Sequence, residues 1–180
     1  MILRSLEIAH YIAKNIDEHW MSEALAVATS KGSDPASTRI GCVIVQDQKF
    51  IGFAHNECQT MQDAIAHAEI VAFRRARLAV ADDDNEGGEL RGAEPYSPLQ
   101  PCGMCTMASI WSNVGWIVFS AGRNDVHRMY IETRHINTLD FIAKAYRDDL
   151  TFTDGVLRED CVRLYYSPDA VLSADDQGNL

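Results

Sequence analysis

The chain has no apolar run that approaches the ~20 residues of a membrane-spanning helix. Its first residues, Met1 to Glu7, lack the basic and then apolar order of a signal peptide, and the sequence shows no internal repeat. It has five cysteines, and an odd count without a signal peptide argues against a framework of disulfides. These absences exclude a disulfide-held secreted scaffold, and they predict a cytoplasmic protein without a membrane partner.

Basic residues are few beside the acidic ones: 16 Lys and Arg against 26 Asp and Glu, for a formal net charge of −10. Two segments without Lys or Arg hold eight of the acids: Asp82, Asp83, Asp84, Glu86, Glu89, Asp169, Asp175 and Asp176. Setting these eight aside leaves about −2 for the rest of the chain. The cluster Arg74, Arg75 and Arg77 is interpreted as a solvated helix face. The charge argues against a nucleic-acid partner without ruling one out, because nucleic-acid domains usually carry a stronger basic footprint.

At 180 residues the chain is long enough for one domain with its own core, which we place at residues 1–167. An acidic tail at 168–180 is predicted to be disordered. Apolar periodicity predicts helices over 2–14, 17–31, 63–81, 103–113, 136–147 and 155–166. It predicts strands over 39–45, 50–54, 95–99, 116–120 and 150–153, the first two forming a hairpin.

This order of elements predicts an α/β fold with three layers, α/β/α, around a central mixed five-stranded sheet. The last two strands are about 30 residues apart with a helix between them. Such a crossover suits parallel strands, so the last two strands are predicted to be parallel.

Two short motifs bring together the side chains of a hydrolytic zinc site. His67-Ala68-Glu69 supplies an imidazole and a carboxylate, and Pro101-Cys102-Gly103-Met104-Cys105 supplies two thiols. Three protein ligands, His67, Cys102 and Cys105, would leave the fourth corner of a tetrahedron open for water. Cysteines three apart on a first helical turn face the same way, and the helix N-terminus favours thiolates. The chain is therefore predicted to bind one Zn2+.

Glu69 is predicted to be the catalytic residue that moves a proton from water to the substrate. Positions two apart on a regular helix point in different directions, so His67 and Glu69 can share a site only at a helix end. The alternative is a structural zinc site, which usually fills all four positions with Cys or His. No second CxxC and no nearby HxxxH supplies a fourth ligand, although Cys58 could.

These motifs resemble those of the cytidine/deoxycytidylate deaminase superfamily, whose zinc signature joins HxE to PCxxC. The resemblance runs from about residue 20 to residue 166, and within the superfamily it is closest to guanine deaminases and tRNA adenosine deaminases. It implies that Asn56 binds the base and that the backbone N–H of Ala68 contacts a substrate carbonyl. Gln100 and Gly103 depart from the Glu-Pro-Cys-Pro-Met-Cys that the family often has.

The resemblance implies a zinc-dependent hydrolytic deaminase that releases ammonia from a free nucleobase, nucleoside or related aminated heterocycle, a guanine-type purine first. The alternatives are a tRNA adenosine deaminase, which predicts a basic groove around the pocket, and a deoxycytidylate-type pyrimidine deaminase. A zinc-stabilised interaction module is the non-enzyme alternative. The resemblance also implies a small-molecule substrate and a homodimer or higher homo-oligomer. Asp125 is interpreted as a cap or turn residue, and Glu132 lies near the place of an acidic residue that reads the purine edge in guanine deaminases.

Overall fold

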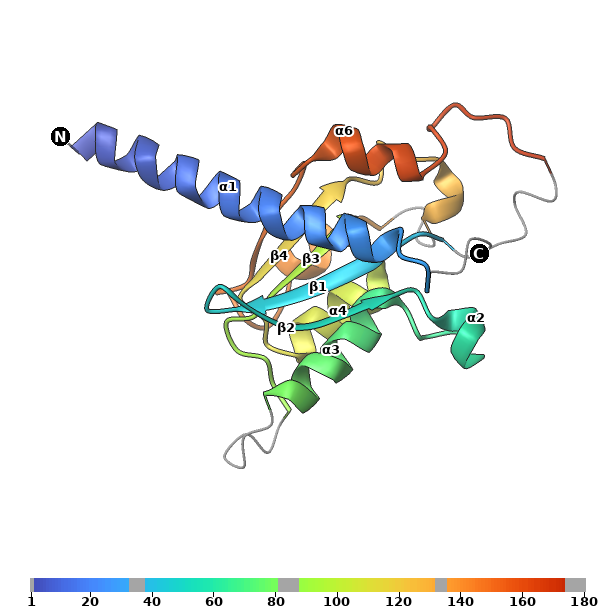
Figure 1. The fold of residues 1–180 in the computed structure, drawn as a ribbon, viewed down its shortest axis with the longest axis horizontal. Helices are drawn as coiled ribbons and strands as arrows, with labels where there is room; N and C mark the ends of the chain where they lie inside the picture. Colours follow the sequence, from blue (N-terminus) through green and yellow to red (C-terminus); the bar gives the residue numbers. More distant parts are fainter. Residues whose placement is uncertain (1, 33–37, 81–87, 132–135, 174–180) are drawn as a thin grey trace.

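The computed structural model describes residues 2–32, 38–80, 88–131 and 136–173, with side chains from residue 11 onward. Its centre is a five-stranded sheet in the order β2-β1-β3-β4-β5 (Figure 1). The strands are β1 (Gly41–Gln46), β2 (Lys49–His55), β3 (Glu94–Leu99), β4 (Trp116–Ala121) and β5 (Thr151–Thr153). β1 is antiparallel to β2 and β3, whereas β3 with β4 and β4 with β5 are parallel. The predicted mixed sheet with a parallel final pair is confirmed.

Four of the five strands run in the same direction. Because β1 is antiparallel to both of its neighbours, β2 points the same way as β3, β4 and β5. The carboxyl ends of these four strands therefore lie at one edge of the sheet, together with the amino end of β1. Ligands of open α/β sheets bind at the carboxyl ends of the strands, so this edge is where a site is expected.

Helices cover both faces of the sheet (Figure 1). α1 (Ile2–Ala28) and α6 (Arg158–Cys161) pack on the face to which Val43 and Val45 of β1 point. α3 (Ala68–Ala79), α4 (Gly103–Trp111) and α5 (Leu139–Ala143) pack on the face to which Cys42 and Ile44 point. Successive residues of a strand face opposite sides, so the buried strand β1 contributes to both cores. The predicted three layers are confirmed.

Two glycines let the helices approach the sheet closely. A Cβ on Gly41 would collide with the backbone of Ala24 in α1, and a Cβ on Gly52 would lie 2.8–2.9 Å from atoms of Ala76 in α3. Backbone therefore packs against backbone on both faces. This contact fixes the distance of α3 from β2, and α3 is the helix that begins at the predicted site.

The helices differ from the predicted ranges. The two N-terminal helices are the single helix α1. The helix predicted from residue 63 begins at Ala68, after the short helix α2 (Cys58–Met61), because φ is +49° at Gln62 and the backbone of His67 is extended. The helix predicted over 136–147 shortens to α5.

The predicted final helix is also interrupted. Positive φ at Gly155 and Leu157 delays it, so only α6 and the 3-10 turn η2 (Val162–Leu164) form, and a further 3-10 turn, η1 (Arg128–Tyr130), was not predicted. Residues 82–87 of the acidic loop, Glu132, and residues 174–180 of the tail lie outside the described residues. Within the described ranges, no helix combines the length and apolarity needed to cross a bilayer.

Candidate metal and active site

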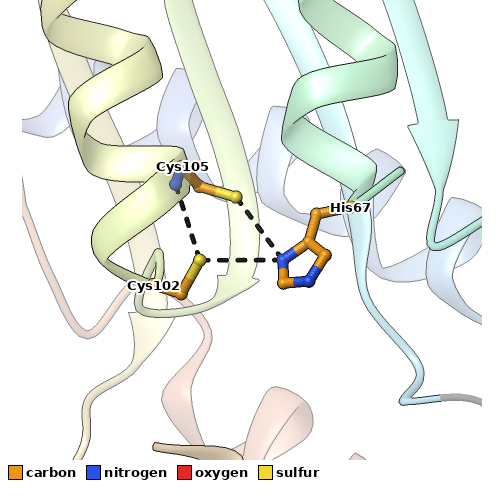
Figure 2. A group of neighbouring side chains, drawn as sticks. All are labelled: His67, Cys102 and Cys105. Carbon is orange, nitrogen blue, oxygen red and sulfur yellow. Dashed lines mark hydrogen bonds between the residues drawn. The ribbon is translucent and has the colours of Figure 1, made fainter. Parts of the chain in front are cut away.

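The three predicted metal ligands meet at the carboxyl edge of the sheet, where two helices begin. His67 immediately precedes α3 and Cys102 immediately precedes α4, and both have an extended backbone, with ψ of 153° and 173°. Cys105 lies in the first turn of α4, where its N–H donates to the Sγ of Cys102 at 3.5 Å. Figure 2 shows the imidazole of His67 directed from one helix start toward both sulfurs at the other.

The distances among these three side chains fit a tetrahedral zinc ion. The Nδ1 of His67 lies 3.6 Å from the Sγ of Cys102 and 3.7 Å from the Sγ of Cys105. Zinc bonds of about 2.0–2.1 Å to nitrogen and about 2.3 Å to sulfur place such atoms about 3.6 Å apart across a tetrahedral angle. A structural zinc site would need a fourth ligand, for which the sequence offered Cys58. Among the described residues, Cys58 does not join this group, and its thiol donates to the carbonyl of Ala64 at 3.7 Å.

The two thiols are arranged to give a proton up to a metal. The side-chain interaction with Cys105, more than the contacts with His67, lowers the pKa of Cys102 to about 4. The same interaction, together with burial, raises the pKa of Cys105. Cys102 is therefore the sulfur that ionises more readily. Zinc binds thiolates, so zinc binding would displace the remaining thiol proton.

Glu69 is buried beside the thiols, with an exposed fraction of 3%. Its Oε2 accepts a hydrogen bond from the Sγ of Cys105 at 3.4 Å. Burial, followed by the negative charge of Cys102, raises the pKa of Glu69 to about 7. Because His67 precedes the helix, the rule that separates helical positions two apart does not apply, and both side chains reach the same site. A carboxyl group with a pKa near 7 can both accept and donate a proton at neutral pH.

Asn56 and Ala68 lie at the same edge of the sheet. Asn56 directly follows β2, where its N–H donates to the carbonyl of Ile40 at 3.0 Å and its Oδ1 accepts from the N–H of Cys58 at 3.2 Å. The side-chain oxygen of Asn56 therefore holds this loop in place. Ala68 is the first residue of α3, where backbone N–H groups have no acceptor within the helix. Their roles as substrate ligands stay predictions.

An ion pair that the sequence did not indicate joins the loop of Asn56 to α3. Arg75 donates to both carboxylate oxygens of Glu57, at 2.7 and 3.0 Å, and to the carbonyl of Phe53 at 3.3 Å. Glu57 is buried, and bidentate pairs of this kind are among the stronger charge-assisted hydrogen bonds. Arg75 is exposed, as the predicted solvated helix face requires, but its guanidinium is also paired with a buried carboxylate. Nothing in the local sequence pairs two residues that stand 18 apart.

Gln100 fastens two loops beside the metal ligands. Its Nε2 donates to Asn137 Oδ1 at 3.0 Å and to Thr138 Oγ1 at 2.9 Å, while its Oε1 accepts from the N–H of Arg123 at 3.1 Å. An ionised glutamate, which the family often has here, could not donate the first two bonds. Gln100, Thr138 and Arg123 line a small pocket together with Cys102, so this network forms one wall next to the metal ligands.

Asp125 takes part in a turn, in keeping with its interpretation as a cap or turn residue. Its Oδ2 accepts from the N–H of Gly122 at 2.8 Å and lies 3.3 Å from a guanidinium nitrogen of Arg158. Glu132, the other acidic candidate, lies outside the described residues.

Comparison with known proteins agrees with this geometry. The family model described as the cytidine and deoxycytidylate deaminase zinc-binding region matches residues 14–121. That range contains all three predicted zinc ligands and Glu69.

Curated relatives at the sequence level are tRNA-specific adenosine deaminases. The one from Bacillus subtilis (strain 168) is 37% identical over 105 residues, which are 58% of this chain and 62% of that protein. The one from Buchnera aphidicola subsp. Schizaphis graminum is 28% identical over 151 residues, which are 83% of this chain and 91% of that protein. The match thus spans less than two thirds of the Bacillus relative and nearly all of the Buchnera relative.

Solved structures share the fold. A tRNA deaminase studied for A-to-I editing at the wobble position of transfer RNA has a TM-score of 0.65 at 24% identity, covering 81% of this chain and 98% of that chain. The guanine deaminase from Nitrosomonas europaea has a TM-score of 0.63 at 24% identity, covering 82% of this chain and 81% of that chain. At this identity the likeness concerns the fold alone.

Proposed function

The chain belongs to the cytidine and deoxycytidylate deaminase family, and from that membership we propose that it is a zinc-dependent hydrolytic deaminase acting on adenosine in tRNA. The observation that carries the reaction type is the placement of buried Glu69 beside the group His67, Cys102 and Cys105. The curated relatives, which are tRNA-specific adenosine deaminases, favour this substrate over the guanine-type purine that the sequence led us to expect first.

The reaction replaces an exocyclic amino group with oxygen: water adds at the ring carbon, the C–N bond breaks, and ammonia leaves. Bound zinc would supply an acidified water, since metal coordination lowers the pKa of water from about 15.7 to around 7. His67, Cys102 and Cys105 are the residues that would hold the ion. Glu69 takes the proton of the attacking water and passes it first to the ring nitrogen and then to the departing amine.

Two further groups orient the base in this proposal. The side-chain NH2 of Asn56 donates to the ring, because its Oδ1 already accepts from Cys58. The backbone N–H of Ala68, at the start of α3, donates to a polar atom of the base.

The test is the conversion of adenosine to inosine in an anticodon stem-loop RNA by the zinc-loaded protein, with ammonia release as a second readout. The matched variant is Glu69→Gln, which removes the proton carrier and keeps the side-chain volume. The proposal requires inosine from the wild type and turnover at least about 10²-fold slower from the variant at equal zinc content. A zinc-stabilised interaction module would show no turnover with either protein, and that result would refute the assignment.

A free purine of guanine type is the second candidate, and the net charge of −10 favours it because a small neutral base needs no basic surface. Guanine, adenosine and deoxycytidylate therefore belong in the same assay as the RNA. Turnover of guanine without turnover of the stem-loop would assign the chain to this class. Turnover of deoxycytidylate alone would assign it to the pyrimidine class.

We also propose a homodimer or higher homo-oligomer, which rests on the resemblance stated above. Two large aromatic side chains, Trp111 of α4 and Tyr146, are 71% and 74% exposed and lie with their ring centroids 6.3 Å apart. Light scattering of the purified protein measures the oligomeric state, and a monomer at micromolar concentration would contradict the proposal.

A further inference from the structure

A hollow with basic walls adjoins the pocket that contains Cys102. It has a volume of about 460 Å3, and its polar lining consists of Arg123, Asn124, His127, Arg128 and Asp169. It shares three wall residues with the pocket of Cys102: Arg123, Val126 and Ile131. The two depressions are therefore neighbours across a common wall, at the edge where β4 ends and η1 begins.

The charge of this hollow is opposite to that of the chain. Three of its nine lining residues are basic or histidine and one is acidic, in a protein with 16 basic and 26 acidic residues. A second groove, between α1 and α6, has the reverse character, with five acidic residues (Asp17, Glu18, Asp154, Glu159 and Asp160) and two basic ones. Charges are screened over about 8 Å at physiological ionic strength. The electrostatic interaction of a ligand in the hollow is therefore set more by the charges of its walls than by the net charge of the whole chain.

Hydrogen bonds hold two of the donors of the hollow, Arg123 and His127, in place. Arg123 donates from Nη1 to the carbonyl of Ile136 at 3.0 Å. The Nδ1 of His127 accepts from the N–H of Met129 at 3.2 Å, which leaves the proton of a neutral ring on Nε2. His127 also donates its backbone N–H to the carbonyl of Tyr166 at 2.8 Å, which fixes the loop that presents this ring.

The nearest acid in the sequence does not neutralise these donors. Asp125 is occupied by the N–H of Gly122 and by the guanidinium of Arg158, as described above. Its negative charge is thus matched by a cation outside the hollow. Asp169 is the one acid among the lining residues.

We propose that this hollow binds a phosphate group of the substrate while the base lies at the metal ligands. Guanidinium groups recognise phosphate through paired N–H donors, and the Nε2–H of a histidine can donate a further hydrogen bond to another phosphate oxygen. The inference rests on the proposed function and deepens it, because it makes the substrate a phosphorylated one: a nucleotide within RNA or a free nucleotide. A free base such as guanine would leave the hollow unused.

The experiment compares Arg128→Glu with Lys49→Glu. Both variants exchange an exposed cation for an anion, but Lys49 begins β2 and so lies at the opposite edge of the sheet. For each protein, the dissociation constant and KM are measured with an anticodon stem-loop RNA, with deoxycytidylate and with free adenosine, over a series of salt concentrations.

We expect Arg128→Glu to weaken stem-loop binding about 10-fold to 100-fold, the loss typical of hydrogen bonds to a charged group. The slope of log K against log salt should also fall by about 1, because one phosphate contact is lost. Lys49→Glu should bind and turn over all three ligands as the wild type does. The effect of Arg128→Glu on the stem-loop must exceed its effect on adenosine.

If the wild type turns over deoxycytidylate and not the stem-loop, and Arg128→Glu impairs that turnover, the hollow still binds phosphate, but the source is a free nucleotide and the tRNA proposal fails. If Arg128→Glu and Lys49→Glu have equal effects while the wild type edits the stem-loop, the tRNA proposal stands and the phosphate site is refuted. A conservative variant, Arg128→Lys, should recover part of the lost affinity, which separates lost charge from misfolding.

Discussion

We expect the substitution Gly52→Ala to displace α3, the helix that begins at His67 and carries Glu69. The new Cβ would lie 2.8 Å from the backbone N of Ala76 and 2.9 Å from its Cα and Cβ, closer than the 3.0 Å that Cβ atoms normally keep. Ordinary contact begins at 3.4 Å, so β2 and α3 must separate by about 0.5 Å or more. The partner atoms belong to the backbone and to a methyl group, and neither can rotate away.

The size of this effect follows from packing and from the metal geometry. Overpacking of a close-packed contact costs about 1–3 kcal/mol of unfolding free energy. In a domain of this size, each kcal/mol lowers Tm by roughly 2–4 °C. Zinc sites tolerate about 0.2 Å of error in ligand distances, so a shift of His67 relative to Cys102 and Cys105 should also weaken zinc binding. The cysteines begin a different helix, α4, which Gly52 does not contact in this way.

Zinc affinity, measured by competition with a chromophoric chelator, and thermal unfolding of the zinc-loaded protein are the assays. Gly92→Ala is the matched control, because φ at Gly92 is +71° and a Cβ there meets nothing within 4 Å. That control should lose about 1–2 kcal/mol through backbone strain while its zinc affinity stays that of the wild type. If Gly52→Ala has the zinc affinity of Gly92→Ala, the reasoning that links the β2–α3 contact to the metal site is refuted.

Three further outcomes are expected. Glu69→Gln should lower kcat about 10²-fold to 10⁴-fold with one zinc ion still bound per chain, as turnover and metal analysis would show; loss of the metal would contradict its role as proton carrier. Chelation of zinc should abolish turnover and lower Tm, with added zinc restoring both; activity that resists chelation would refute the metal assignment. Arg75→Ala leaves buried Glu57 without its partner, so unfolding free energy should fall by about 1–3 kcal/mol and KM should rise more than kcat falls. Arg74→Ala, which removes a half-exposed neighbour, is the control. Equal effects of the two variants would contradict the stabilising role of the Arg75–Glu57 ion pair.

Much of the fold was predictable because strands and their order follow from local pattern. The five strands lie where alternation and apolar runs predicted them, and the crossover length predicted the parallel pair β4 and β5. The helices were less predictable, since their ends depend on single residues in unusual conformations. Leu157, with φ of +52°, immediately precedes α6 in a left-handed conformation that its side chain does not favour.

The candidate site was predictable to the extent that its residues stand close together in the sequence. Cys102 and Cys105 share one helical turn, and His67 and Glu69 share one helix start, so spacing and residue type pointed to them. Three features were not predictable: the ion pair of Arg75 and Glu57, the hydrogen-bond network of Gln100, and the basic hollow around Arg128. Each joins residues from separate loops and helices, and their pairing depends on how those elements pack.

By itself, the sequence determined which side chains are available for zinc and proton transfer, and in which order strands and helices follow each other. Only the tertiary structure decided that the Nδ1 of His67 faces both sulfurs, that Glu69 is buried with its pKa raised to about 7, and that cations gather beside the metal pocket in an acidic chain. The physical reason is that residue types are local, whereas distances, burial and fields arise from elements brought together across the sheet. Spacing can name a ligand, but only packing places it within bonding distance of the others.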